Sequence, residues 1–193
     1  MTKFIKVLLI VIFGMWAICG YASELPGNSL YHLSGKWINQ DAKEIELKEF
    51  KEKPVIMAMV YLTCHYSCPT IISQVETLSK KVSDKIRDNT QIVLVSFDPS
   101  RDTPEKMKAY AIKRKLNPKR WVFITNPSEQ KIRELAASLN FKYQKIENDD
   151  FSHSFMIVLL DELGVIRARV DSTSQELDSF ANTLTKMTSI KLK

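Results

Sequence analysis

The sequence predicts an α/β sandwich, in which helices cover a central mixed β-sheet, and three observations lead to this class. Three continuous apolar runs, typical of strands buried on both faces, occupy residues 54–62, 90–98 and 121–125. Apolar residues recur at helical spacing after the first and the third of these runs, and helix-start residues follow the second. The last third of the chain holds short strands and a turn, which favours antiparallel pairing at one edge of the sheet.

The three helices that follow these strands have recognisable starts. Pro69 suits the first position of a helix, where its missing N–H costs nothing. Thr103 resembles an N-cap ahead of Pro104, and Asn126 with Pro127 restarts the chain as a third helix. The inner faces are expected to be apolar, formed by Ile71, Val75, Leu78, Val82 and Ile86 in the first helix and by Ile132, Leu135, Ala136 and Leu139 in the third.

Short strands and one closing helix complete the fold. Residues 141–146 (FKYQKI) and 153–161 (HSFMIVLLD) are expected strands, and the turn ELG joins the second of them to residues 165–170 as an antiparallel hairpin. Alternation with a turn over residues 29–47 predicts an added N-terminal β-hairpin. Four apolar residues define the closing helix: Leu177, Phe180, Ala181 and Leu184. We expect one domain, over residues 24–193.

The first 23 residues are predicted to be a separate export segment. Lys3 and Lys6 precede an uncharged apolar run, residues 7–20, which is shorter than the roughly 20 residues of a comfortable transmembrane helix. A small-x-small site follows, so the pattern indicates a signal peptide cut after Ala22 or Ser23. Retention as an uncleaved membrane anchor is the alternative, and lipid attachment at Cys19 is less favoured. Either route exports the domain.

Composition excludes several classes of protein. The 193 residues are 45% hydrophobic and 26% charged, which fits an ordinary folded domain rather than a disordered or fibrous chain. Loss of the export segment would lower the formal charge from +6 to +4. The densest basic cluster, KRKLNPKR at residues 113–120, is accompanied by no nucleic-acid motif. It is interpreted as a solvated helix end or, alternatively, as an electrostatic patch for an acidic partner.

Two cysteines remain once the export segment is set aside. Cys64 and Cys68 lie in YLTCHYSCPT, where the first central strand leads into its helix, and sites gather at such carboxyl ends of strands. A disulfide that closes so small a loop would add little stability. Nearby helix N–H groups favour the thiolate, which is both the nucleophile and the metal ligand. Thiol exchange and metal binding both stay open at this point.

The three histidines differ in their relation to these cysteines. His32 belongs to the N-terminal hairpin and is expected at the surface. His65 lies between the cysteines and is either a solvent-facing loop residue or close to a bound metal. His153 opens a predicted strand, and a histidine in such a place is more often structural than a ligand. Two thiolates and one imidazole suit copper, whereas a structural zinc ion normally takes four protein ligands.

The segment DPSRDTP ends the second central strand with two aspartates and an arginine. Asp102 or Thr103 could cap the next helix, which would make the segment a turn and nothing more. Asp98 stands at the carboxyl end of a strand next to the one that leads to the cysteines, so it could instead lie near them.

Taken together, these segments resemble the Sco/SenC family of thioredoxin-like copper proteins over residues 29–186. The resemblance is carried by KPVIMAMVYLTCHYSCP, VLVSFDPSRDTPEKMKAYA, RWVFIT and HSFMIVLLDELGVIRARV. It implies a thioredoxin-like fold and a copper ion held by Cys64, Cys68 and His153, with Asp98 near the site. The chain departs from the family pattern at His65, where proline is common. This histidine could change the metal affinity or the redox potential of the site.

The resemblance implies a metallochaperone rather than an enzyme. It would deliver copper to the binuclear copper site of a cytochrome c oxidase from the bacterial periplasm, in soluble or membrane-anchored form. Its partners would be the copper-site subunit of the oxidase and, further, other copper chaperones or thiol-disulfide reductants. The alternative is a periplasmic thiol-disulfide oxidoreductase that uses Cys64 and Cys68 as a redox pair and tolerates the loss of His153.

Overall fold

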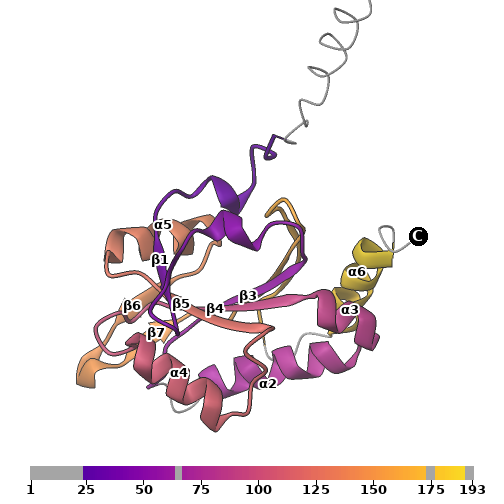
Figure 1. Cartoon of the computed structure of the whole chain (residues 1–193). Helices are drawn as coiled ribbons and strands as arrows, with labels where there is room; N and C mark the ends of the chain where they lie inside the picture. The colour runs from indigo at the N-terminus through magenta and orange to yellow at the C-terminus, as the bar shows by residue number, and fades with distance from the viewer. Residues whose placement is uncertain (1–23, 64–66, 173–176, 190–193) are drawn as a thin grey trace, which may run out of the picture.

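The structure, a computed structural model, describes residues 24–63, 67–172 and 177–189 (Figure 1). The predicted export segment, residues 1–23, lies outside the described residues. Within them, no helix is both long and apolar enough to cross a membrane.

A seven-stranded mixed sheet forms the centre of the fold, in the order β2-β1-β5-β4-β3-β8-β9. Three parallel strands occupy its middle: β3 (Val55–Val60), β4 (Gln91–Ser96) and β5 (Trp121–Thr125). The short hairpin β1 (Trp37–Asn39) and β2 (Glu44–Ile45) adds antiparallel to β5. At the other side, β8 (Ile157–Leu160) pairs antiparallel with β3, and β9 (Ile166–Val170) pairs with β8.

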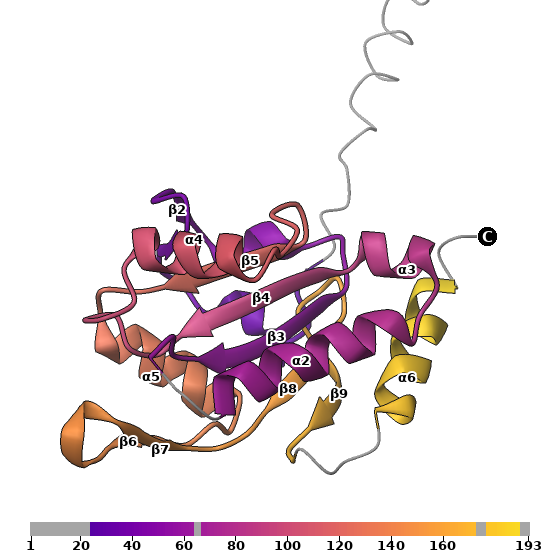
Figure 2. The same cartoon turned by 90° about the horizontal axis from the view of Figure 1, so that it is seen from below.

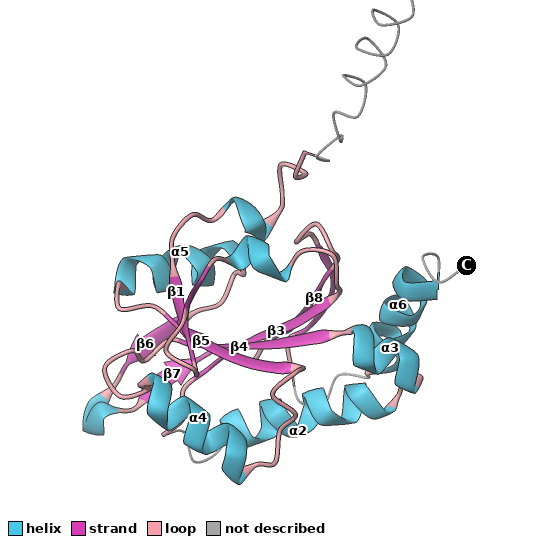
Figure 3. Cartoon of the chain, viewed as in Figure 1, coloured by secondary structure: helices cyan, strands magenta, loops and turns pink. Residues whose placement is uncertain are grey.

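Helices cover both faces of this sheet (Figures 1 and 3). One face carries α2 (Ser67–Lys80) and α4 (Pro104–Lys113), while α5 (Glu129–Ser138) covers the other. The shorter α3 (Asp84–Asn89) and the closing helix α6 (Asp178–Ser189) contact each other near the end of α2. Single 3₁₀ turns, η1 (Leu30–His32), η2 (Leu47–Phe50) and η3 (Glu147–Asp149), complete the chain. The predicted α/β sandwich with an added N-terminal hairpin is confirmed.

The first predicted helix differs from the observed one at both ends. Helix α2 begins at Ser67, so Pro69 is its third residue and not its first; proline is still tolerated there because the first-turn N–H groups have no intrahelical partner. The helix ends at Lys80, and the extended Ser83 starts a separate helix, α3. Val82 and Ile86 are nevertheless buried, because both helices pack on the same core.

The predicted strand 153–161 is two strands of different sheets. His153 closes β7 (Phe151–His153), which pairs only with β6 (Tyr143–Lys145) in a two-stranded hairpin, and the main sheet resumes at Ile157 in β8. Burial explains the division, because β8 is buried along its whole length whereas β7 alternates between half-buried and exposed residues. The hairpin extends beyond the main sheet in Figure 2.

Candidate metal centre

The carboxyl end of β3 leads directly to the predicted cysteines. Tyr61, Leu62 and Thr63 follow the strand, and Cys64 and His65 come next but lie outside the described residues. Cys68 lies in the first turn of α2, where only the backbone is described. The positions of the two thiols therefore stay predictions. The residues that the structure does describe next to these segments are given below.

His153 is brought to this end of β3 from more than ninety positions further along the chain. Its half-buried ring stands edge-on to Tyr61, with 5.6 Å between ring centroids, and 5.4 Å from the ring of Phe97. The ring Nδ1 lies 2.8 Å from the carbonyl oxygen of Ser154. A carbonyl can only accept, so Nδ1 carries the proton and the lone pair of the neutral ring is on Nε2.

The ring of His153 contacts those of Tyr61, Phe97 and Phe141. These three, with Tyr143 and Phe151, form what we call the aromatic cluster. Phe97, at the end of β4, is its centre, because its ring lies 4.9–5.4 Å from those of all four other members. Tilted and edge-on rings at such distances attract beyond their buried area, by about 0.5–1.5 kcal/mol a pair. The cluster thereby ties the β6–β7 hairpin to the main sheet.

Two polar contacts strengthen this tie. The hydroxyl of Tyr61 donates a hydrogen bond to the carboxylate of Asp150, at the start of β7. That bond, with a second from the backbone N–H of Phe151, holds the pKa of Asp150 below its ordinary value. The guanidinium of Arg101 lies over the rings of Tyr61 and Phe151, 5.9 and 5.5 Å from their centroids.

Asp102 fixes the segment that leads to Cys64. Its side chain is fully buried, and its Oδ2 accepts from the N–H of Leu62 at 2.9 Å and from the hydroxyl of Ser96 at 2.6 Å. Burial raises the pKa of Asp102, and the two hydrogen bonds offset part of that rise. Thr103 is the N-cap of α4, as predicted, so Asp102 is not a helix cap but links β3, β4 and the cysteine loop.

Asp98 is also buried, with 3% of its surface exposed, at the same edge of the sheet. Its carboxylate accepts from the hydroxyl of Ser100 at 2.8 Å and pairs with Arg101. Its distance from the cysteines is not described, so its place in a metal centre stays a prediction. His32 is exposed, as expected, but lies in η1 ahead of the hairpin, with its Nε2 2.9 Å from the carbonyl oxygen of Pro26.

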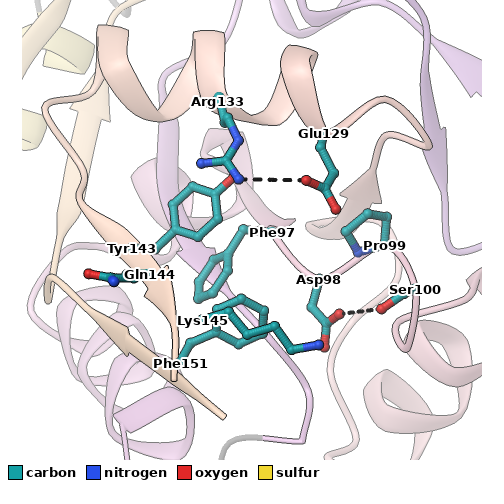
Figure 4. Close-up of a pocket in the computed structure, with 10 residues that line it drawn as sticks. All are labelled: Phe97, Asp98, Pro99, Ser100, Glu129, Arg133, Tyr143, Gln144, Lys145 and Phe151. Atoms are coloured by element: carbon teal, nitrogen blue, oxygen red, sulfur yellow. Dashed lines mark hydrogen bonds and ion pairs between the residues drawn. The ribbon is translucent and has the colours of Figure 1, made fainter. Parts of the chain in front are cut away.

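A cavity of about 220 Å³ opens beside the aromatic cluster (Figure 4). Asp98 and Ser100 form one wall, and the pair Glu129–Arg133 of α5, whose charged atoms lie 3.6 Å apart, forms another. The hairpin supplies the remaining wall through Tyr143, Gln144, Lys145 and Phe151. Two acids and two cations line the cavity, so its charge is balanced.

Sequence reasoning missed most of these supporting residues. Tyr61 is indistinguishable from a core residue at a strand end, and Asp102 precedes Thr-Pro in a pattern that also fits a helix cap. The pair of aspartates in DPSRDTP was a usable signal, although only Asp98 was selected from it. In the described part of the chain, no three His, Cys, Asp or Glu side chains come together as a metal site.

Comparisons with known proteins identify the family. The model of the SCO1/SenC family matches residues 30–189, and the chain belongs to this family. The SCO1 protein homolog of Bacillus subtilis (strain 168) is 30% identical over 114 residues, which span 58% of this chain and 58% of that protein. The match thus covers less than two thirds of that relative.

Solved structures show the same fold. ScoI of Bradyrhizobium japonicum, with copper bound, superposes with a TM-score of 0.65 at 22% identity, over 79% of this chain and 96% of that one. BsSco, a member of the Sco family of cytochrome c oxidase assembly proteins in which a disulfide switch was identified, gives 0.68 at 23% identity, over 81% and 92%. The thioredoxin-like fold predicted from the sequence is confirmed.

Proposed function

We propose that this Sco/SenC protein is a copper-binding metallochaperone whose cargo is held by the thiolates of Cys64 and Cys68 and by the imidazole of His153. The observation that carries the proposal is the contact of the His153 ring with Tyr61, three residues before Cys64. Nothing in the local sequence of either segment requires this proximity. A redox dithiol would need no histidine beside it, whereas a three-ligand metal site would.

The donor set fits copper. Thiolates are soft ligands that select Cu(I), and imidazole accommodates either oxidation state of copper. The hydrogen bond from Nδ1 of His153 to the Ser154 carbonyl supports ligation through Nε2, because metal-binding histidines usually donate their other N–H to such an acceptor. Cargo would leave by ligand exchange, as thiolates of a partner replace those of this chain one at a time.

The expected client is the binuclear copper site of a cytochrome c oxidase. Two relatives support this direction: ScoI of Bradyrhizobium japonicum has copper bound, and BsSco belongs to a family of oxidase assembly proteins. The copper-site subunit of the oxidase would be the acceptor, and another copper chaperone the donor. We place the protein in the bacterial periplasm, soluble or anchored to the inner membrane, on the pattern of residues 1–23.

Anaerobic copper titration tests the proposal on the chain from Glu24 onward, which contains every described element and lacks Cys19. One equivalent of Cu(I) should bind tightly to the reduced protein. Cys64→Ala/Cys68→Ala should abolish this binding, and His153→Ala should weaken it by about tenfold or more. The matched control His32→Ala removes an exposed histidine and should change nothing. Weak, non-stoichiometric binding that is indifferent to His153 would overturn the proposal.

A thiol-disulfide oxidoreductase is the second candidate, favoured by the disulfide switch of BsSco. The thiolate of Cys64 would attack a partner disulfide and release one partner thiolate, and Cys68 would then attack the mixed disulfide and release the second. The pair of this chain would end oxidised and the partner reduced. His153→Ala separates the two functions, because thiol exchange should be unchanged in this variant whereas copper binding should be weakened by about tenfold or more.

A further inference from the structure

A second group of charged side chains lies at the amino ends of the central strands, whereas the candidate metal centre lies at their carboxyl ends. A hollow of about 350 Å³ opens there, lined by residues of the end of α2, of helix α3 and of the connection from α4 to β5. Among its lining residues only Glu76 is acidic, while four are cationic: Lys80, Arg87, Lys115 and Arg120. The basic cluster of residues 113–120 supplies the last two.

The backbone fixes Arg120 at this hollow. Its carbonyl oxygen accepts from the N–H of Ile92 and from the side-chain amide of Gln91, each at 2.8 Å. Its own N–H donates to the carbonyl of Asn117 at 3.0 Å, which closes the turn that follows α4. These hydrogen bonds hold the backbone of Arg120 at the amino end of β4.

The guanidinium of Arg120 is not neutralised by its surroundings. Its Nη2 lies 3.4 Å from the hydroxyl of Ser79, its Nε is buried without a hydrogen-bond partner, and no carboxylate of the described residues forms an ion pair with it. Burial lowers the pKa of Arg120, and the attraction of Asp88 offsets this only in part. A negative charge in the hollow would stabilise the guanidinium.

The other cations leave the hollow positive. Arg87 is already paired, since it lies 2.7 Å from Asp84 and 3.7 Å from Asp88. Lys80 and Lys115 are exposed at the rim and form no ion pair with the carboxylates that the structure describes. Three unpaired cations from two separate segments thus surround one concave space that holds a single acid.

We infer that this hollow binds a phosphate-class anion, either inorganic phosphate or the phosphomonoester headgroup of a lipid. A phosphate monoester carries a charge of about −1.5 to −2 and three acceptor oxygens, which can be shared among Arg120 and the rim lysines. The concave shape favours a compact anion over the flat surface of an acidic protein. The inference is independent of copper binding, because the hollow and the candidate metal centre lie at opposite ends of the strands.

Calorimetric titration of the full chain in a non-ionic detergent tests this inference. The probes are sodium phosphate and dihexanoyl phosphatidic acid, with sodium chloride at equal ionic strength and dihexanoyl phosphatidylcholine as controls. The variants are Arg120→Gln and the double change Lys80→Gln/Lys115→Gln. Lys119→Gln is the matched control, because Lys119 is exposed in the same turn but does not line the hollow.

Saturable binding of at least one phosphate probe is expected, with neither control compound binding. Arg120→Gln and the double lysine change should each raise Kd by about tenfold or more, and Lys119→Gln by about twofold at most. Bound phosphate should also raise the unfolding midpoint by about 5–10 °C at a hundredfold excess over Kd. Binding of phosphatidic acid alone would identify a lipid as the source, and binding of inorganic phosphate alone the free anion.

Two results would overturn the inference. One is the absence of saturable binding for both phosphate probes, and the other is an equal loss of affinity in Lys119→Gln and Arg120→Gln. If Arg120→Gln does not fold, the double lysine variant decides, because both lysines are exposed and their loss leaves the core unchanged.

Discussion

Strand β3 leads to the predicted cysteine ligands and the hairpin β6–β7 carries His153, and the two elements are built in different ways. Strand β3 is paired along both edges, and none of its six residues is more than 1% exposed. Strand β7 pairs only with β6, and its residues are half-buried or exposed. The cysteine side therefore rests on the core of the protein, whereas the histidine side rests on a hairpin held by the aromatic cluster.

The two sides of the candidate metal centre are therefore expected to differ in local stability. An isolated two-stranded hairpin is marginal in water, so β6–β7 depends on its contacts with the sheet. Those contacts are the rings around Phe97 and the hydrogen bond from Tyr61 to Asp150. Local opening of the hairpin would withdraw His153 while the strands that lead to the cysteines stay folded. Such an arrangement is consistent with the metal release that we propose.

The largest effect is expected from Phe97→Ala, compared with Phe123→Ala. Both phenylalanines are buried, so each change should lower the free energy of unfolding by about 3–5 kcal/mol. Only Phe97 contacts the hairpin, since Phe123 packs against Tyr110 instead. Hydrogen exchange of residues 143–153 should rise beyond the global effect in Phe97→Ala alone. Equal loss of protection in both variants would show that the hairpin is not held by the aromatic cluster.

Substitutions at Asp102 test what holds the segment that leads to Cys64. Asp102→Ala removes two hydrogen bonds from Leu62 and Ser96 and leaves buried donors unpaired, so it should cost about 2–4 kcal/mol in a denaturant titration. Asp102→Asn keeps an acceptor oxygen and should cost about 1 kcal/mol or less. If both variants are equally destabilised, the hydrogen bonds are not what holds this segment.

The same residue makes stability depend on pH. The folded-state pKa of Asp102 lies above its unfolded value, so the folded protein holds the proton more tightly. Its contribution is fully present below the unfolded pKa and is lost as pH rises through the folded pKa. Asp102→Asn should therefore flatten the fall in stability between these two values, which urea titrations at several pH values would detect.

The next largest effect is expected from Tyr61→Phe, which keeps the ring and removes only the hydrogen bond to Asp150. Hydrogen exchange in β6 and β7 should become about tenfold faster, with little change in the central strands. The low pKa of Asp150 means that this bond stabilises the hairpin above the unfolded pKa and is lost as pH falls through the folded one. The variant should therefore show less of the acid-induced loosening of the hairpin, because only the hydrogen bond from the N–H of Phe151 to Asp150 remains. Unchanged exchange would contradict the role given to Tyr61.

The smallest effect is expected from Arg133→Gln. The guanidinium of Arg133 lies 5.5 Å from the ring centroid of Tyr143 but its side chain is 63% exposed, so the contact should contribute about 0.5 kcal/mol. Hairpin exchange should rise about twofold. Lys131→Gln is the matched control, because Lys131 pairs within α5 with Glu134 at 2.8 Å. An effect of the same size in Lys131→Gln would show that the contact of Arg133 with Tyr143 does not stabilise the hairpin.

The sequence predicted the sheet better than the residues that support the candidate site. Buried parallel strands leave long apolar runs, so β3, β4 and β5 could be read directly, and Thr103 with Pro104 marked the start of α4. The boundary between β7 and β8 could not be recognised, because residues 153–161 contain no glycine or proline. Asp102 and Tyr61 were missed because their roles depend on partners 40 and 89 positions away in the chain.

X-ray absorption at the copper edge would identify the ligands of the bound metal. We expect two sulfur ligands and one imidazole nitrogen in the Cu(I)-loaded protein, and loss of the imidazole in His153→Ala with both sulfurs retained. Tyr61→Phe should keep all three ligands but release copper faster to a competing chelator. A spectrum with sulfur ligands alone, identical in the wild type and in His153→Ala, would contradict the claim that the hairpin completes the site.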